Sequence, residues 1–190
     1  MSRKAKSRAI AVAARRALPD SQRHLADQAI LAGAVRLATG RRQIAAYLPM
    51  PGEPGGPGLV DALAAVAHVI LPVLRPDRDL DWAEYGGPGR LRASVGSPLL
   101  REPAGCPLGP DAVARADLVL VPALAVDRAG VRLGRGGGSY DRALARVAAK
   151  TLVVALLYDG EVHDALPAEA HDRVVSAVLS PAGFHTIHMS

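Results

Sequence analysis

The feature that most constrains this chain is a glycine-rich segment, residues 130–142, that lies between two apolar runs. The segment reads GVRLGRGGGSYDR, with one apolar run before it at residues 117–121 and another after it at residues 151–157. Continuous apolar runs of this length are typical of strands buried on both faces of a parallel sheet. Apolar residues at helical spacing over residues 140–148 predict a helix between them. The order strand, loop, helix, strand predicts an α/β fold.

The glycine-rich segment has the composition of an anion-binding loop. Besides Gly130 at its start, it contains four closely spaced glycines: Gly134, Gly136, Gly137 and Gly138. Glycine lets a loop turn several N–H groups toward one anion, and a helix that opens near Ser139 would add its positive end. Arg132 and Arg135 add cationic heads, and Asp141 is placed to bind a divalent metal. A phosphate group is the predicted ligand, and a flexible surface turn is the alternative.

The common motifs with similar glycine content do not match. The phosphate-binding motif of P-loop proteins needs Lys directly after its last glycine and Ser/Thr after that Lys, whereas this loop has Ser139 and Tyr140 at these two positions. The dinucleotide motif fails because Gly134, Gly136 and Gly138 alternate strictly, and Ser139 lies outside any nucleophile elbow. Phosphate chemistry with a hard metal remains, and Asp172, in the sequence HDR, is a second candidate metal ligand beside Asp141.

Length and hydrophobicity predict one domain. The 190 residues are 49% hydrophobic but only 3% aromatic, so Ala, Val and Leu must fill the core. We expect a single domain over residues 1–190, with a helical segment at residues 1–40 and an α/β core at residues 43–190. The predicted architecture has three layers around a mostly parallel central sheet flanked by helices, with the N-terminal helices packed on one face.

Charge and cysteine content narrow the partners and the compartment. There are 23 Lys and Arg against 18 Asp and Glu, a net charge of +5, which suits an anionic ligand. Nucleic-acid surfaces usually interleave cations with exposed aromatic residues, so we expect no nucleic-acid partner. No apolar run reaches the length of a membrane span. The single cysteine, Cys106, fits a reducing compartment, so we expect a cytoplasmic protein. We also expect the protein to be a monomer.

Two further places hold candidate ligand-binding residues. In the N-terminal helix, Lys4, Arg8 and Arg15 have spacings that place them along one line of the helix. A solvated helix face is the default interpretation of this pattern. Glu53 is the only charged residue in a Pro/Gly-rich loop after the predicted strand at residues 43–48, where a parallel sheet places its ligand. Position alone does not separate ligand contact from an ordinary loop acid.

The chain resembles the 5-formyltetrahydrofolate cyclo-ligase family. The resemblance rests first on PALAVDRAGVRLGRGGGSYDR, residues 122–142, which looks like the family signature. Four further matches occur in the same order as in the family: KAKSR at residues 4–8, YLPMPGE at 47–53, Glu102-Pro103, and LPAEAHD at 166–172. The resemblance implies ATP- and Mg²⁺-dependent conversion of 5-formyltetrahydrofolate to 5,10-methenyltetrahydrofolate, with release of ADP and phosphate, through a phosphorylated formyl group.

The resemblance also implies roles for individual residues. The implied ATP-binding residues are Lys4, Arg8, Arg132, Leu133, Gly134, Arg135, Gly136, Gly137, Gly138, Ser139 and Tyr140. The implied folate-binding residues are Leu48 and Glu53, together with the loop Arg135, Gly136, Gly137, Gly138 and Ser139. Asp141 and Asp172 match the family's magnesium positions. Arg135, Tyr140 and Glu53 are the predicted catalytic residues.

Three positions depart from the family pattern: Ser139 replaces a frequent tyrosine, Ser176 replaces a frequent acid, and Val126 replaces an aromatic residue. The alternative functions are a paralogue that binds folate or nucleotide without turnover, an ATP-dependent phosphotransferase acting on another small molecule, and a basic nucleic-acid-binding protein.

Overall fold

The computed structural model describes residues 2–95 and 97–187. The predicted domain also includes residue 1, residue 96 and residues 188–190, which lie outside the described part. The helices are α1 (Arg3–Ala17), α2 (Asp20–Ala38), α3 (Leu59–Ala64) and α4 (Ser139–Leu144), with 3-10 helices η1 (Pro88–Arg90) and η2 (Pro110–Arg115). The strands are β1 (Gln43–Ala45), β2 (His68–Leu74), β3 (Leu80–Glu84), β4 (Leu91–Ser94), β5 (Ser97–Pro103), β6 (Leu118–Pro122), β7 (Ala125–Asp127), β8 (Arg132–Leu133), β9 (Leu152–Leu156), β10 (Val162–His163), β11 (Ala177–Ser180) and β12 (Gly183–Thr186).

A seven-stranded sheet forms the centre of the fold, in the order β12-β11-β9-β6-β1-β2-β3. The five strands from β11 to β2 in this order pair in parallel, whereas the edge strands β12 and β3 pair antiparallel to their neighbours. A three-stranded sheet, β10-β7-β8, and a β4-β5 hairpin complete the strands. The predicted mostly parallel α/β sheet is therefore confirmed.

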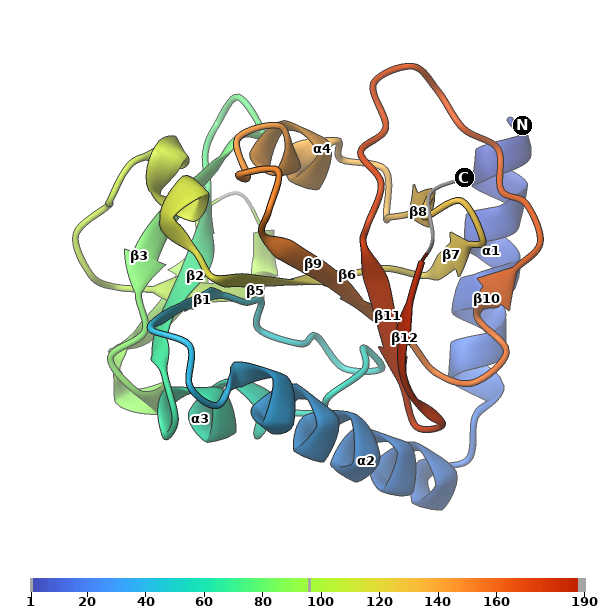
Figure 1. Ribbon diagram of the computed structural model, residues 1–190, viewed down its shortest axis with the longest axis horizontal. Coiled ribbons are helices and arrows are strands. Elements are labelled where there is room, and N and C mark those ends of the chain that lie inside the picture. Colours follow the sequence, from blue (N-terminus) through green and yellow to red (C-terminus); the bar gives the residue numbers. More distant parts are fainter. Residues whose placement is uncertain (1, 96, 188–190) are drawn as a thin grey trace.

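Helical elements cover both faces of the central sheet (Figure 1). On one face, α2 and α3 pack over a core that includes Ile30, Leu63 and Leu120. On the other face, α4 and η2 pack over a core that includes Val113 and Leu144. Because both faces are covered, β6 is buried along most of its length, as its continuous apolar sequence predicts.

The two N-terminal helices occupy different places. Helix α2 covers a face of the central sheet, whereas α1 stands beside the three-stranded sheet (Figure 1). There, Ala11 and Val12 of α1 pack against a small core of Leu124, Ala125 and Leu133. Few large apolar side chains hold α1, so polar contacts must contribute much of its attachment.

Local sequence explains where α1 begins and ends. The Ser2 hydroxyl oxygen accepts a hydrogen bond from the Ala5 N–H at 3.2 Å, which caps the first turn. Pro19 lies two residues beyond the last helical residue and starts α2 in a new direction. No helix in residues 2–95 or 97–187 combines the length and apolar character needed to cross a membrane.

Strand β1 is shorter than the predicted strand at residues 43–48. It ends at Ala45, and residues 46–58 form an irregular segment that contains Glu53. Four prolines and four glycines between Leu48 and Leu59 prevent a continuing ladder, because proline lacks the N–H that a ladder needs. The segment leaves the carboxyl end of β1, where parallel sheets bind their ligands.

Candidate functional site

One pocket of about 550 Å³ contains every residue that the sequence and the resemblance assign to a site. The predicted site residues that line it are Lys4, Arg8, Leu48, Glu53, Arg132, Leu133, Gly134, Arg135, Gly136, Gly137, Gly138, Ser139, Tyr140, Asp141 and Asp172. It lies beyond the carboxyl ends of β1 and β6, because the segments that follow these strands also line it. Lys4 and Asp172, which are 168 residues apart in sequence, therefore line the same cavity.

Two glycines of the loop make room for arginine side chains. Arg8 Nε donates to the Gly134 carbonyl at 2.9 Å, and a Cβ on Gly136 would lie 3.1 Å from Arg8 Cζ. Gly136 also has φ +101°, a conformation that favours glycine. A Cβ on Gly134 would lie 2.8 Å from Arg132 Nη1. The glycines thus bring two guanidinium groups against the loop backbone, a role that the sequence analysis did not assign to them.

The helix after the glycine loop is shorter than the sequence predicts. Helix α4 covers only Ser139–Leu144, and hydrogen bonds from the N–H groups of Arg146 and Val147 to carbonyls three residues earlier tighten the chain after it. The prediction of a helix through residue 148 was wrong in length, although its start at Ser139 is confirmed. A helix of this length has a weak dipole, so side-chain cations supply most of the positive potential here.

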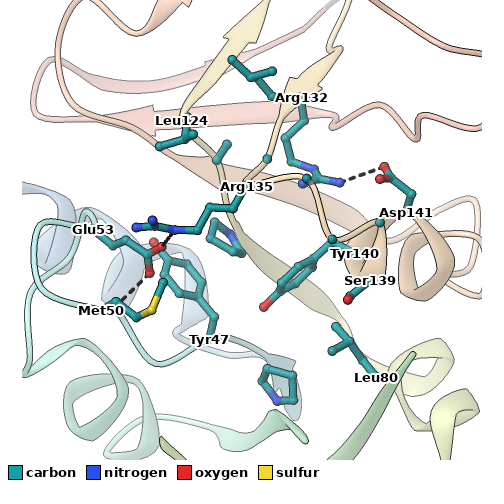
Figure 2. A pocket seen from close by; sticks show the side chains of 18 of the residues that line it. Tyr47, Met50, Glu53, Leu80, Leu124, Arg132, Arg135, Ser139, Tyr140 and Asp141 are labelled. Atoms are coloured by element: carbon teal, nitrogen blue, oxygen red, sulfur yellow. Dashed lines mark hydrogen bonds and ion pairs between the residues drawn. The ribbon is translucent and has the colours of Figure 1, made fainter. Parts of the chain in front are cut away.

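Arg135 and Glu53 form an ion pair across the pocket (Figure 2). Arg135 Nε donates to Glu53 Oε1 at 2.9 Å, and Glu53 Oε2 accepts from the Met50 N–H at 3.0 Å. The Glu53 side chain is buried, whereas that of Arg135 is half exposed. The pair joins the segment after β1 to the glycine loop, so two predicted catalytic residues are in direct contact.

Two tyrosines line the pocket next to this ion pair. Burial, followed by the negative charge of Glu53, raises the pKa of both Tyr47 and Tyr140. The Tyr140 hydroxyl is therefore held in its neutral form, which can donate a hydrogen bond. The Arg132 guanidinium lies 5.8 Å from the centre of the Tyr140 ring, a cation–π distance. Tyr47 donates to the Pro54 carbonyl at 3.0 Å and so fixes the Glu53 segment.

The two predicted metal ligands each face a cation. Asp141 Oδ1 accepts from Arg132 Nη2 at 2.8 Å, and Asp172 accepts from Lys4 Nζ at 2.7 and 3.0 Å. Among the residues that the structure describes, no three His, Cys, Asp or Glu side chains form a metal-binding group. Mg²⁺ commonly takes one or two carboxylates and completes its shell with phosphate oxygens and water. Two carboxylates beside an anion-binding loop fit that chemistry.

Arg132 adds an unsatisfied donor to the same part of the pocket. Its Nε is buried and has no hydrogen-bond partner within the described residues. An unpaired buried donor is costly in a folded protein. This arrangement suits a site that receives an anion.

Arg15 is a residue whose importance the sequence analysis missed. A solvated helix face was the default interpretation of its pattern, and for Arg15 that interpretation was wrong. Arg15 Nε and Nη2 bind the Glu161 carboxylate at 2.6 and 2.7 Å, Nη2 also donates to the Ala123 carbonyl, and its guanidinium lies 5.5 Å from the Tyr158 ring centre. The signal was its position on the same helix line as Lys4 and Arg8.

The pocket also has an apolar wall that no motif indicated. Its members are Leu71, Pro72 and Leu74 of β2, Leu80 of β3 and Leu100 of β5. We call this set the apolar wall. We call the cations Lys4, Arg8, Arg132 and Arg135, together with the glycine loop, the cationic wall.

Two of the three departures from the family pattern lie outside the pocket. Val126 is in the core, and the Ser176 hydroxyl accepts a hydrogen bond from the Val153 N–H.

Comparison with known proteins decides the family. The sequence model of the 5-formyltetrahydrofolate cyclo-ligase family matches residues 1–181. The chain belongs to this family. The predicted family and enzyme class are therefore confirmed.

Individual members of the cyclo-ligase family match over most of their length. A 5-formyltetrahydrofolate cyclo-ligase of Mycolicibacterium smegmatis is 42% identical over 173 residues, which cover 88% of each chain. That of Escherichia coli is 33% identical over 181 residues, 88% of this chain and 94% of the relative. The solution structure of Aquifex aeolicus 5,10-methenyltetrahydrofolate synthetase superposes with a TM-score of 0.81 at 25% identity, covering 98% of this chain and 93% of that one.

Proposed function

We propose that this cyclo-ligase family enzyme converts 5-formyltetrahydrofolate to 5,10-methenyltetrahydrofolate and uses ATP with magnesium. The observation that carries the proposal is that every residue implied by the family resemblance lines one pocket. The pocket joins a cationic wall suited to a triphosphate and an apolar wall suited to a ring system. Both substrates would therefore meet at the glycine loop.

In the proposed reaction, the formyl oxygen attacks the γ-phosphorus of ATP in line, and ADP leaves. The N10 amine of the folate then attacks the activated formyl carbon. The C–O bond to the phosphoryl group breaks as the ring closes, and phosphate leaves with the proton lost from N10. Arg135 and the N–H groups of residues 135–139 would stabilise the charge that spreads over the transferring phosphoryl group. Lys4, Arg8 and Arg132 would bind the remaining phosphate oxygens.

The other pocket residues would align the substrates. Glu53 holds Arg135 at 2.9 Å and would keep its guanidinium aimed at the phosphoryl group. Glu53 and Leu48, which both line the pocket, would border the folate. Tyr140 would donate a hydrogen bond as a neutral phenol. Magnesium bound by Asp141 and Asp172 would neutralise phosphate charge, and their present partners Lys4 and Arg132 would then be free to contact phosphate oxygens.

The proposal is tested by mixing the purified protein with 5-formyltetrahydrofolate, ATP and Mg²⁺ and following the near-ultraviolet absorbance of the methenyl product. We expect a rise that disappears when any one component is omitted. ATP binding by calorimetry without product would favour a non-catalytic paralogue. A phosphorylated product without ring closure would favour a phosphotransferase.

A further inference from the structure

The pocket contains a second buried acid, Glu102, to which no role has been given. Glu102 lies on β5, is only 3% exposed, and lines the pocket beside the leucines of the apolar wall. A carboxylate buried among apolar side chains is costly unless strong hydrogen bonds compensate it. Its position therefore needs an explanation.

The two buried acids of the pocket differ in how well they are satisfied. Glu53 accepts hydrogen bonds at 2.9 and 3.0 Å, one on each oxygen. Glu102 accepts from the Leu74 N–H at 3.4 Å and from Arg92 Nε at 3.3 Å. Hydrogen bonds to a charged carboxylate are usually about 2.7–2.9 Å long. Glu102 thus has accepting capacity that its present partners do not use.

The surroundings of Glu102 define the ligand that it suits. Leu74, Leu80 and Leu100 line the same wall, and flat rings pack well against such side chains. A carboxylate has two oxygens that accept a pair of parallel N–H donors. A 2-aminopyrimidin-4-one ring, which forms one end of a folate, presents such a pair on one edge: the ring N3–H and an N–H of the 2-amino group.

We propose that Glu102 is a specificity-determining residue that accepts these two hydrogen bonds from the aminopyrimidinone edge of the substrate. The inference rests on the proposed function and extends it, because it assigns the pterin end to the apolar wall. Glu53, already bound to Arg135, is then left to orient the groups at the reacting end. The substrate class is a reduced pterin that retains an unsubstituted 2-amino group.

A structural role for Glu102 is the competing explanation, and the chain offers a matched control for it. Arg92 and Glu102 are directly opposite on the β4-β5 hairpin, and their ion pair spans 3.3 Å. Arg92 is half exposed and does not line the pocket. Arg92→Gln therefore removes the same ion pair as Glu102→Gln without changing the pocket surface.

The test measures KM for 5-formyltetrahydrofolate and for ATP in the wild type, Glu102→Gln and Arg92→Gln. We expect Glu102→Gln to raise the folate KM by about 10- to 100-fold, the loss typical of charged hydrogen bonds, with the ATP KM unchanged. Arg92→Gln should leave both within about twofold. Equal losses in the two variants would overturn the proposal, because the hairpin ion pair would then explain them.

A second measurement needs no variant, so it remains decisive if Glu102→Gln does not fold. The probe is a 5-formyltetrahydrofolate analogue with methyl in place of the 2-amino group, and calorimetry gives its affinity for the wild type. We expect it to bind at least about 10-fold more weakly than 5-formyltetrahydrofolate. Equal affinities would overturn the assignment of Glu102 while leaving the proposed reaction intact. A wild type that neither binds nor turns over 5-formyltetrahydrofolate would overturn both.

Discussion

The two walls of the pocket are built from different kinds of sequence. The cationic wall comes from one short motif and one helix, and its side chains are polar, partnered and close to glycine. The apolar wall comes from β2, β3 and β5, and its leucines belong to no motif. The cationic wall suits the charged triphosphate of ATP, and the apolar wall suits the flat ring system of the folate. Substitutions on one wall should therefore affect mainly one of the two substrates.

The largest effect is expected on the cationic wall, at Arg135. Arg135→Ala should lower kcat by about 10³-fold, because one preorganised charged donor at the transferring group typically contributes this much. The measurement is steady-state methenyl formation at saturating ATP and folate. The circular dichroism spectrum should stay near that of the wild type, whereas the melting temperature should fall, because the buried Glu53 carboxylate loses its charged partner. Near-normal turnover would remove Arg135 from the mechanism.

Glu53→Gln tests the residue that joins the reacting ends of both substrates. It should raise the folate KM by about 10-fold, and it should also lower kcat because the amide holds Arg135 less strongly. The ATP KM should change little. Rapid-quench measurement of ATP cleavage separates the two effects. Unchanged folate kinetics would show that Glu53 only positions Arg135.

Arg15 tests whether the cationic wall depends on how α1 is docked. Arg15→Met keeps the length of the side chain but loses the Glu161 ion pair, so Lys4 and Arg8 should be held less well against the pocket. We expect the ATP KM to rise about fivefold with the folate KM unchanged. Arg16→Met, at an exposed neighbouring position, is the matched control. Equal rises in both KM values would indicate general destabilisation instead.

Features of the fold and the site that depend on local sequence could be predicted, whereas features that depend on distant partners could not. The parallel strands, the start of the helix at Ser139 and the glycine loop are encoded locally, by apolar runs and turn residues, so they could be predicted. The burial of Arg15 and Glu102 could not, because each depends on partners distant in sequence, such as Glu161 for Arg15. The sequence also could not show why glycine is needed at residues 134 and 136, because the need arises from the close approach of the Arg132 and Arg8 side chains.

The smallest effect is expected at an ion pair that belongs to neither wall. Asp79 accepts from Arg146 at 2.6 and 3.0 Å and ties the turn before β3 to the segment after α4. The Arg146 hydrogen bonds hold the pKa of Asp79 below its usual value. A lowered folded-state pKa stabilises the fold above the unfolded value of about 4, and this stability is lost as the pH falls through the folded value.

Asp79→Asn should therefore lower the melting temperature by about 3 °C at pH 7, and the difference from wild type should shrink below about pH 4. Thermal melts from pH 7 to pH 2.5 measure it. Both KM values should remain at wild-type levels, because Asp79 and Arg146 do not line the pocket. A melting difference that persists at pH 2.5 would contradict the ionic origin of the effect. A changed KM for either substrate would show that α4 transmits strain to the glycine loop, so that the cationic wall extends beyond the residues that line it.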